Sequence, residues 1–123
     1  MSLLERRARR KRLKIAILRA MRKGFNGSEA AAHHGVSLGT FFQWQWSDAA
    51  FSAALKVASK ERVRYLKLVV VAKLRDGWLL KEVAEAVGPT QGTVRAWRRK
   101  DPAFDAQVES LLREQRKLLN QRR

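Results

Sequence analysis

The feature that most constrains this chain is an internal repeat with an offset of 53 residues. Residues 14–55 align with residues 67–108 without a gap, and 13 of the 42 aligned pairs are identical. These pairs are Lys14/Lys67, Arg22/Arg75, Gly24/Gly77, Glu29/Glu82, Ala31/Ala84, Gly35/Gly88, Gly39/Gly92, Thr40/Thr93, Trp44/Trp97, Asp48/Asp101, Ala50/Ala103, Phe51/Phe104 and Ala53/Ala106. Self-similarity at one fixed spacing is typical of a duplicated supersecondary unit. The chain is therefore expected to contain two copies of one small fold.

Both copies have the pattern of an all-α fold. Apolar residues recur at helical spacing, and no stretch alternates between apolar and polar residues as a strand would. Glycines are predicted to end the first helix of each copy and to permit a sharp turn before the third. The residues predicted to cap the later helices are Ser28, Ser37 and Asp48 in copy one and Thr90 and Asp101 in copy two.

Four segments are expected along the chain. They are a basic N-terminal arm (1–13), copy one (14–58), copy two (59–108) and an amphipathic basic C-terminal helix (109–123). Between Asp48 and Asp76 there is neither Gly nor Pro. The two copies are therefore joined either by one long continuous helix or by two helices with a short break near residues 59–62.

The spacing of small and apolar residues in each copy predicts two tandem helix-turn-helix units. Two short helices that cross closely need a small residue on the first, a glycine at the turn and apolar residues on the inner side of the second. In copy two these residues are Ala84, Gly88 and Trp97, and copy one has the same three residue types 53 positions earlier.

The strings SEAAAHHGVSLGTFFQW and KEVAEAVGPTQGTVRAW resemble the helix-turn-helix of phage terminase small subunits and of related transposase and homeodomain-like modules. The run TVRAWRRKDPAF, with TFFQWQWSDAAF as its weaker twin, is similar to the Trp-x3-Asp-x2-Phe ending of terminase small subunits. This resemblance implies a DNA-binding protein of a phage or mobile element.

Copy two carries the side chains expected of a helix that contacts bases. The second helix of a helix-turn-helix enters the major groove, where arginine can bond guanine and glutamine can bond adenine. The residues predicted to contact bases are Thr90, Gln91, Arg95 and Arg99. The residues predicted to lie near phosphates are Arg6, Arg7, Arg9, Arg10, Lys11 and Arg12 in the N-terminal arm and Thr93, Arg98 and Lys100 in copy two.

The corresponding face of copy one has a different chemistry. It consists of Ser37, Leu38, Phe42, Gln43 and Trp46. Residues 24–55 contain no Lys or Arg, but they contain Glu29 and Asp48. Two interpretations stay open: the face contacts DNA, including thymine methyl groups, or it is buried against copy two, a second subunit or another protein.

The net charge of the chain favours a polyanionic partner. Lys and Arg number 27 against 11 Asp and Glu, which gives a net charge of +16. Double-stranded DNA fits such an excess. The basic run RRARRKRLK is either a disordered arm or the basic start of the first helix, and both forms would neutralise phosphates. The C-terminal helix is expected to pack on the domain, with an oligomer contact as the alternative.

Several other classes of protein are not favoured. The chain has no cysteine and only two adjacent histidines, so no metal site is expected. No nucleophile with a base and no carboxylate pair suggests an enzyme, and no cofactor motif is present. No apolar run approaches the roughly 20 residues of a membrane span, and no signal peptide is evident.

We therefore expect a non-enzymatic, double-stranded DNA-binding protein in the cytoplasm of a bacterial host, associated with the nucleoid. Three roles stay open. The first is recognition of a DNA site in the manner of a terminase small subunit. The second is transcription regulation at a phage operator. The third is a protein-interaction or architectural role, in which the basic regions coat DNA without sequence preference.

Overall fold

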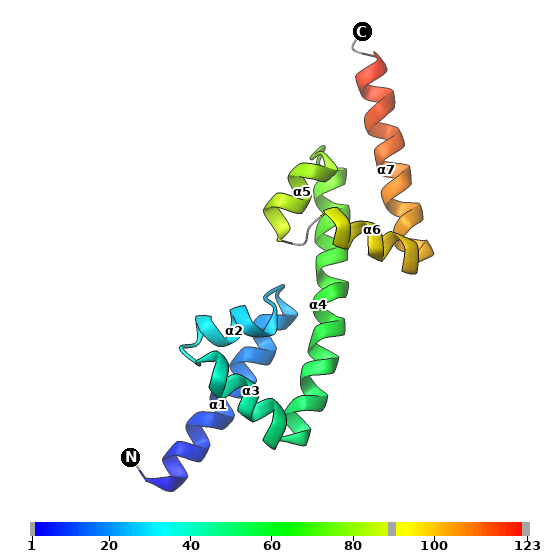
Figure 1. The fold of residues 1–123 in the computed structure, drawn as a ribbon. Helices are drawn as coiled ribbons and strands as arrows, with labels where there is room; N and C mark the ends of the chain where they lie inside the picture. Colours follow the sequence, from blue (N-terminus) through cyan, green and yellow to red (C-terminus); the bar gives the residue numbers. More distant parts are fainter. Residues whose placement is uncertain (1, 89–90, 122–123) are drawn as a thin grey trace. The chain divides into compact units, whose positions relative to one another are not determined.

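The chain is described here by a computed structural model that covers residues 2–88 and 91–121. These residues form helices and no strand, which confirms the all-α prediction (Figure 1). The helices are α1 (Leu3–Arg22), α2 (Gly27–His33), α3 (Leu38–Ser47), α4 (Ala49–Arg75), α5 (Leu80–Val87), α6 (Gln91–Lys100) and α7 (Pro102–Gln121).

The chain divides into two compact units, unit 1 (Met1–Tyr65) and unit 2 (Leu66–Arg123). The repeat predicted a boundary after residue 58, but no loop marks the division, because α4 runs without a break from Ala49 to Arg75. The alternative with a break near residues 59–62 is therefore wrong. Ala, Leu, Lys and Arg recur through this segment, and these residues favour a helix.

Apart from the cap residue Ser2, the described residues of both predicted terminal segments are helical and belong to longer helices. The helix α1 begins at Leu3, and the Ser2 hydroxyl accepts a hydrogen bond of 3.1 Å from the backbone N–H of Glu5. Residues 3–13 are therefore the first turns of α1 and not a disordered arm. Residues 109–121 likewise continue α7, which begins at Pro102.

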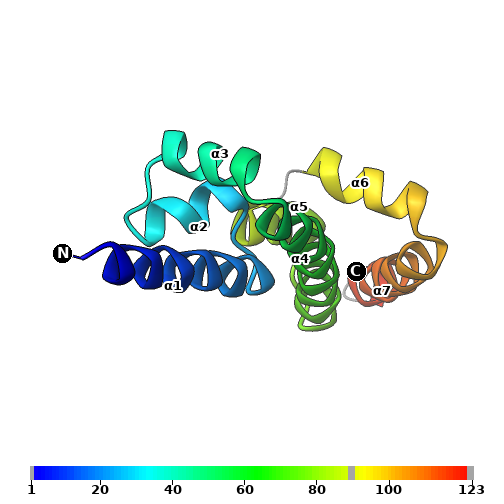
Figure 2. The ribbon, with the colours of Figure 1, turned by 90° about the horizontal axis from the view of Figure 1, so that it is seen from below.

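Unit 1 places its core between α1, α2, α3 and the first half of α4. In it α2 packs against α1, and α3 packs against α2 (Figures 1 and 2). The buried apolar side chains are Ile17, Ala20, Met21, Ala30, Ala31, Val36, Phe41, Trp44, Phe51, Leu55 and Ala58. Ala30 and Ala31 of α2 are buried in this core, and their small side chains let the neighbouring helices approach α2 closely.

Unit 2 consists of the last turns of α4 together with α5, α6 and α7, and in it α5 packs against α6, and α6 packs against α7. Its buried core consists of Val70, Val71, Leu74, Val83, Val94, Phe104 and Val108. Leu111 and Leu112 pack on this core, while Leu118 and Leu119 near the end of α7 are exposed. Of the predicted C-terminal helix (109–123), only the first turn therefore packs on the core of unit 2.

One predicted helix cap is wrong. Ser28 was expected to cap the second helix, but α2 begins one residue earlier, at Gly27, with Asn26 as its cap. The Asn26 side chain accepts a hydrogen bond of 2.8 Å from the backbone N–H of Glu29, and the Glu29 carboxylate accepts one of 3.1 Å from the backbone N–H of Asn26. This reciprocal pair satisfies two N–H groups that the helix leaves free, whereas Ser28 lies already inside the helix.

Several identities of the repeat have a structural role. Lys14 donates to Asp48 at 2.8 Å in unit 1, and Lys67 donates to Asp101 at 2.9 Å in unit 2. Each aspartate also accepts a backbone N–H at the start of its helix, from Phe51 or its counterpart in unit 2. The lysine hydrogen bond, together with the backbone bond, holds the pKa of each aspartate below its ordinary value. The repeat therefore preserves a lysine–aspartate tie between the first helix of each unit and the start of the last.

The glycines of the repeat also act alike in both units. Gly35 has a φ of 72° and Gly88 a φ of 102°, in the region that favours glycine over other residues. Both stand at the end of the second helix of their unit, where the chain turns toward the third. That each pair of short helices is a DNA-binding helix-turn-helix stays a prediction.

Candidate nucleic-acid interface

The helix α6 of unit 2 has one buried side and one cationic side. Val94 is fully buried, and Trp97 packs partly on the same core. Gln91, Arg95 and Arg99 follow one another at intervals of four residues, so they form one stripe along the helix. All three are exposed, and neither arginine forms an ion pair with any described residue. Three of the four residues predicted to contact bases therefore share one accessible face.

The remaining predicted residues of this region lie differently. Thr90 falls outside the described residues. Thr93 is half-buried, and Lys100 at the end of α6 is exposed. Arg95, Arg98 and Arg99 also line a shallow hollow of about 260 Å³, together with Asp105 of α7. Arg95 and Arg99 form no ion pair with a described residue, so they give this surface a positive charge.

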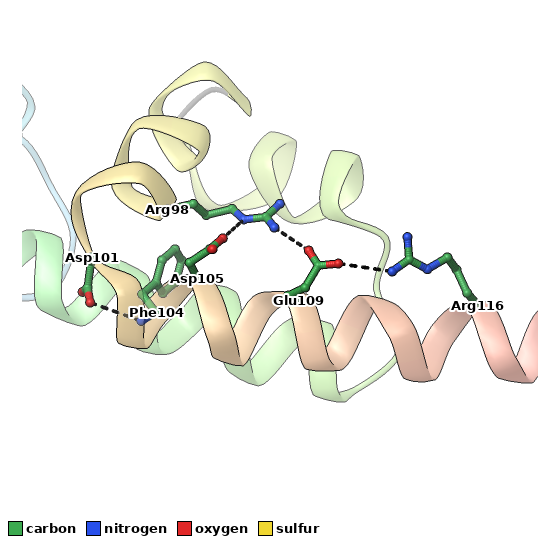
Figure 3. Close-up of polar contacts among 6 residues, drawn as sticks. All are labelled: Arg98, Asp101, Phe104, Asp105, Glu109 and Arg116. Carbon is green, nitrogen blue, oxygen red and sulfur yellow. Dashed lines mark hydrogen bonds and ion pairs between the residues drawn. The ribbon is translucent and has the colours of Figure 1, made fainter.

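Arg98 forms ion pairs with two carboxylates of α7 (Figure 3). Its Nε donates to Asp105 Oδ1 and its Nη2 donates to Glu109 Oε2, each at 2.6 Å. Asp105 and Glu109 are four residues apart on α7, so both carboxylates project from one side of that helix. The two bonds raise the pKa of Arg98 above its ordinary value, with the Asp105 bond as the larger cause.

The Arg98 clamp, which consists of Arg98, Asp105 and Glu109, fixes α6 on α7. Arg116 donates to the other oxygen of Glu109 at 3.3 Å and extends this network. The Arg98 side chain is only 22% exposed. We therefore interpret Arg98 as a residue that positions α6, and we do not count it among the phosphate contacts that the sequence predicted.

This role of Arg98 could not be predicted from the sequence, because Arg98 stands beside Arg99 and Lys100 in one basic run. A second contact that the sequence did not predict lies at the other end of α7. The Gln115 side chain donates to the backbone carbonyl groups of Leu74, at 3.2 Å, and Trp78, at 2.8 Å. It ties α7 to the end of α4.

Unit 1 carries the second cationic surface. All six basic residues predicted in the N-terminal arm are exposed on the first turns of α1, and none forms an ion pair with a described residue. These residues are Arg6, Arg7, Arg9, Arg10, Lys11 and Arg12. A helix displays such charges on a fixed surface, which lets them contact phosphates without first becoming ordered.

The face of α3 predicted for copy one is exposed. Ser37, Leu38, Phe42, Gln43 and Trp46 are all exposed, and Trp46 is exposed to 92%. Phe41 and Trp44 point inward and are buried. The Ser37 hydroxyl caps α3 by accepting a bond of 3.2 Å from the Thr40 N–H. The outward face of α3 is thus uncharged and mostly apolar, whereas that of α6 is cationic.

Comparisons with protein-family models, with curated protein sequences and with solved structures found no match to this chain. Within residues 2–88 and 91–121, no helix is both long enough and apolar enough to cross a bilayer. The same residues contain no cluster of three or more His, Asp or Glu side chains that could hold a metal ion.

Proposed function

We propose that this protein binds double-stranded DNA and that α6 is its base-contacting helix. The observation that carries this proposal is the exposed stripe Gln91, Arg95 and Arg99, whose cations have no ion-pair partner among the described residues. An arginine fork in the major groove bonds guanine O6 and N7, and a glutamine can bond adenine. The Arg98 clamp supports the proposal, because base contacts need a helix that is held in one orientation.

The basic turns of α1 supply the second part of this function. DNA affinity depends largely on phosphate neutralisation, which does not depend on sequence. Six exposed cations on α1 and a net charge of +16 fit that requirement. In this proposal α1 provides affinity for any duplex, and α6 provides preference for a site.

The proposal is tested by comparing Arg95→Ala with Gln43→Ala. Both residues are exposed on the third helix of their unit, but only Arg95 belongs to the α6 stripe. Loss of one bidentate base contact lowers specific affinity by roughly 1–3 kcal/mol, which is about 5- to 150-fold. Equal losses for the two variants in a gel-shift titration would contradict the assignment of α6.

Within this class we favour a DNA-recognition protein of the terminase small subunit type, which rests on the resemblance of the two helix–turn–helix strings. Regulation at an operator and non-specific coating of DNA are the alternatives. The subunit mass in solution distinguishes the terminase-type role from regulation at an operator, since a large ring suits packaging and a dimer matches an operator with two half-sites. Binding without any sequence preference would support the coating role.

A further inference from the structure

The third helix of unit 1 has no basic residue, and its outward face is apolar. Sequence alone left open whether this face meets DNA or protein. The structure places a basic surface beside it. A cleft of about 640 Å³ lies between the first turns of α1 and the start of α3, and we call it the α1–α3 cleft. Arg6, Arg9 and Arg10 line it from α1.

The polar side chains that line this cleft opposite the arginines are the N-cap of α3, Ser37, and Thr40 in its first turn. Ser37 and Thr40 line the α1–α3 cleft, together with Gly35, Val36 and Trp44. No acidic residue lines it, and the arginines form no ion pair with any described residue. Arginine and hydroxyl side chains are the usual partners of DNA phosphate oxygens. The cleft therefore has the chemistry of a backbone contact.

Gly39 provides a second, independent observation. It lies inside α3, between Ser37 and Thr40, and it is exposed. A Cβ atom built at Gly39 meets nothing within 4 Å, and the φ angle of this residue is not positive. Alanine would therefore fit and would favour the helix more than glycine does. Nothing inside unit 1 requires a glycine here, so a glycine at this position is better explained by the close approach of a binding partner to α3.

We propose that unit 1 is a second DNA-contacting surface. In it, the α1–α3 cleft binds the phosphate backbone, and the start of α3, where Gly39 has no side chain, lies against the duplex. In this arrangement α1 supplies the cations that α3 lacks. Leu38 at the first position of α3 and Phe42 one turn later are both exposed and would meet thymine methyl groups. Gly92 occupies the aligned position of α6, which is also exposed. This inference rests on the proposed DNA-binding function and extends it to unit 1.

The first test compares two double variants of α1. R6Q/R9Q removes two cations that line the α1–α3 cleft, and R7Q/K11Q removes two that line a different cleft, beside the start of α4. Both change the charge equally. Each phosphate contact contributes about 0.9 to the slope of log affinity against log salt. We expect R6Q/R9Q to bind a labelled duplex about tenfold or more weaker, with a slope lower by about two, and R7Q/K11Q to lose clearly less of both.

The second test uses Gly39→Ala. We expect this variant to melt at a higher temperature than the wild type and yet to bind the duplex more weakly, because the added methyl group holds the DNA away. A purely structural role for Gly39 would move stability and binding together. If Gly39→Ala binds as the wild type does, and R6Q/R9Q loses no more than R7Q/K11Q, the inference is wrong.

Two further results distinguish a failure of this inference from a failure of the proposed DNA-binding function. If the wild-type protein does not bind duplex DNA, the proposed function itself fails. If wild type binds DNA, and Phe42→Ser with Trp46→Ser lowers the subunit mass in solution without weakening DNA binding, the α3 face joins protein subunits, which overturns the inference alone.

Discussion

Replacing Arg98 by glutamine separates a positioning role from a phosphate contact. The variant loses the Nε bond to Asp105 and the Nη2 bond to Glu109, both of 2.6 Å. The carboxylates are 46% and 41% exposed, so solvent screens both ion pairs. An exposed pair contributes up to about 1 kcal/mol, so two pairs that share a half-buried arginine contribute roughly 1–2 kcal/mol. For a unit of this size the melting temperature should fall by about 4–15 °C.

The matched control is Arg99→Gln, which removes the same charge from the neighbouring residue. Arg99 is exposed and has no ion-pair partner among the described residues. We expect Arg99→Gln to change stability by less than about 0.5 kcal/mol. It should lower the salt slope of DNA binding by about one if it contacts a phosphate and leave that slope unchanged if it contacts a base.

The two measurements are thermal unfolding by circular dichroism and duplex binding by fluorescence anisotropy at several salt concentrations. For Arg98→Gln we expect a lower melting temperature, weaker binding and an unchanged salt slope. If Arg98→Gln melts like Arg99→Gln and lowers the salt slope by about one, Arg98 is a phosphate contact and the reasoning on the clamp is refuted.

Two further predictions concern charge. In one variant, glutamine replaces the six basic residues on the first turns of α1, which are Arg6, Arg7, Arg9, Arg10, Lys11 and Arg12. This variant should bind all duplexes more weakly, and the salt slope of its binding should be lower by at least about two. An unchanged slope in anisotropy titrations would show that α1 does not contact the DNA. The pKa values of Asp48 and Asp101 are lowered from 3.8, so their stabilisation is present above that pH and is lost as the pH falls through the folded-state pKa values. In urea unfolding, D48N/D101N should therefore lose less stability between pH 7 and acidic pH than the wild type does. Asparagine keeps the helix cap but carries no carboxylate that can be protonated. Equal losses of stability in the two proteins would show that these carboxylates do not govern the acid response.

Much of the fold follows from local signals in the sequence. The turn glycines and the caps Ser37, Asp48 and Asp101 act as predicted, because each depends only on residues within one helical turn. The predicted cap at Ser28 was wrong because Asn26 and Ser28 are both good capping residues and lie only two positions apart. The signal that distinguishes them was present, since Asn26 has a glutamate three residues later and so forms a capping box.

The interface was predictable in part. The outward faces of α3 and α6 follow from helical periodicity once Trp44 and Val94 are placed in the core. The role of Arg98 does not follow, because it depends on where α7 presents Asp105 and Glu109. The α1–α3 cleft could not be predicted either, since Arg6 and Ser37 are far apart in the chain and line one cleft only in the folded unit. Such contacts depend on tertiary packing and not on spacing in the chain.

The central claim is that α6 chooses the DNA site, and selection of bound sequences from random duplexes tests it most directly. Wild type and Arg95→Ala should be selected in parallel under one salt concentration. We predict that the wild type enriches a defined site and that Arg95→Ala loses the preference, about 5- to 150-fold, at one guanine position while the other positions keep theirs. Identical base preferences for the two proteins would contradict the claim.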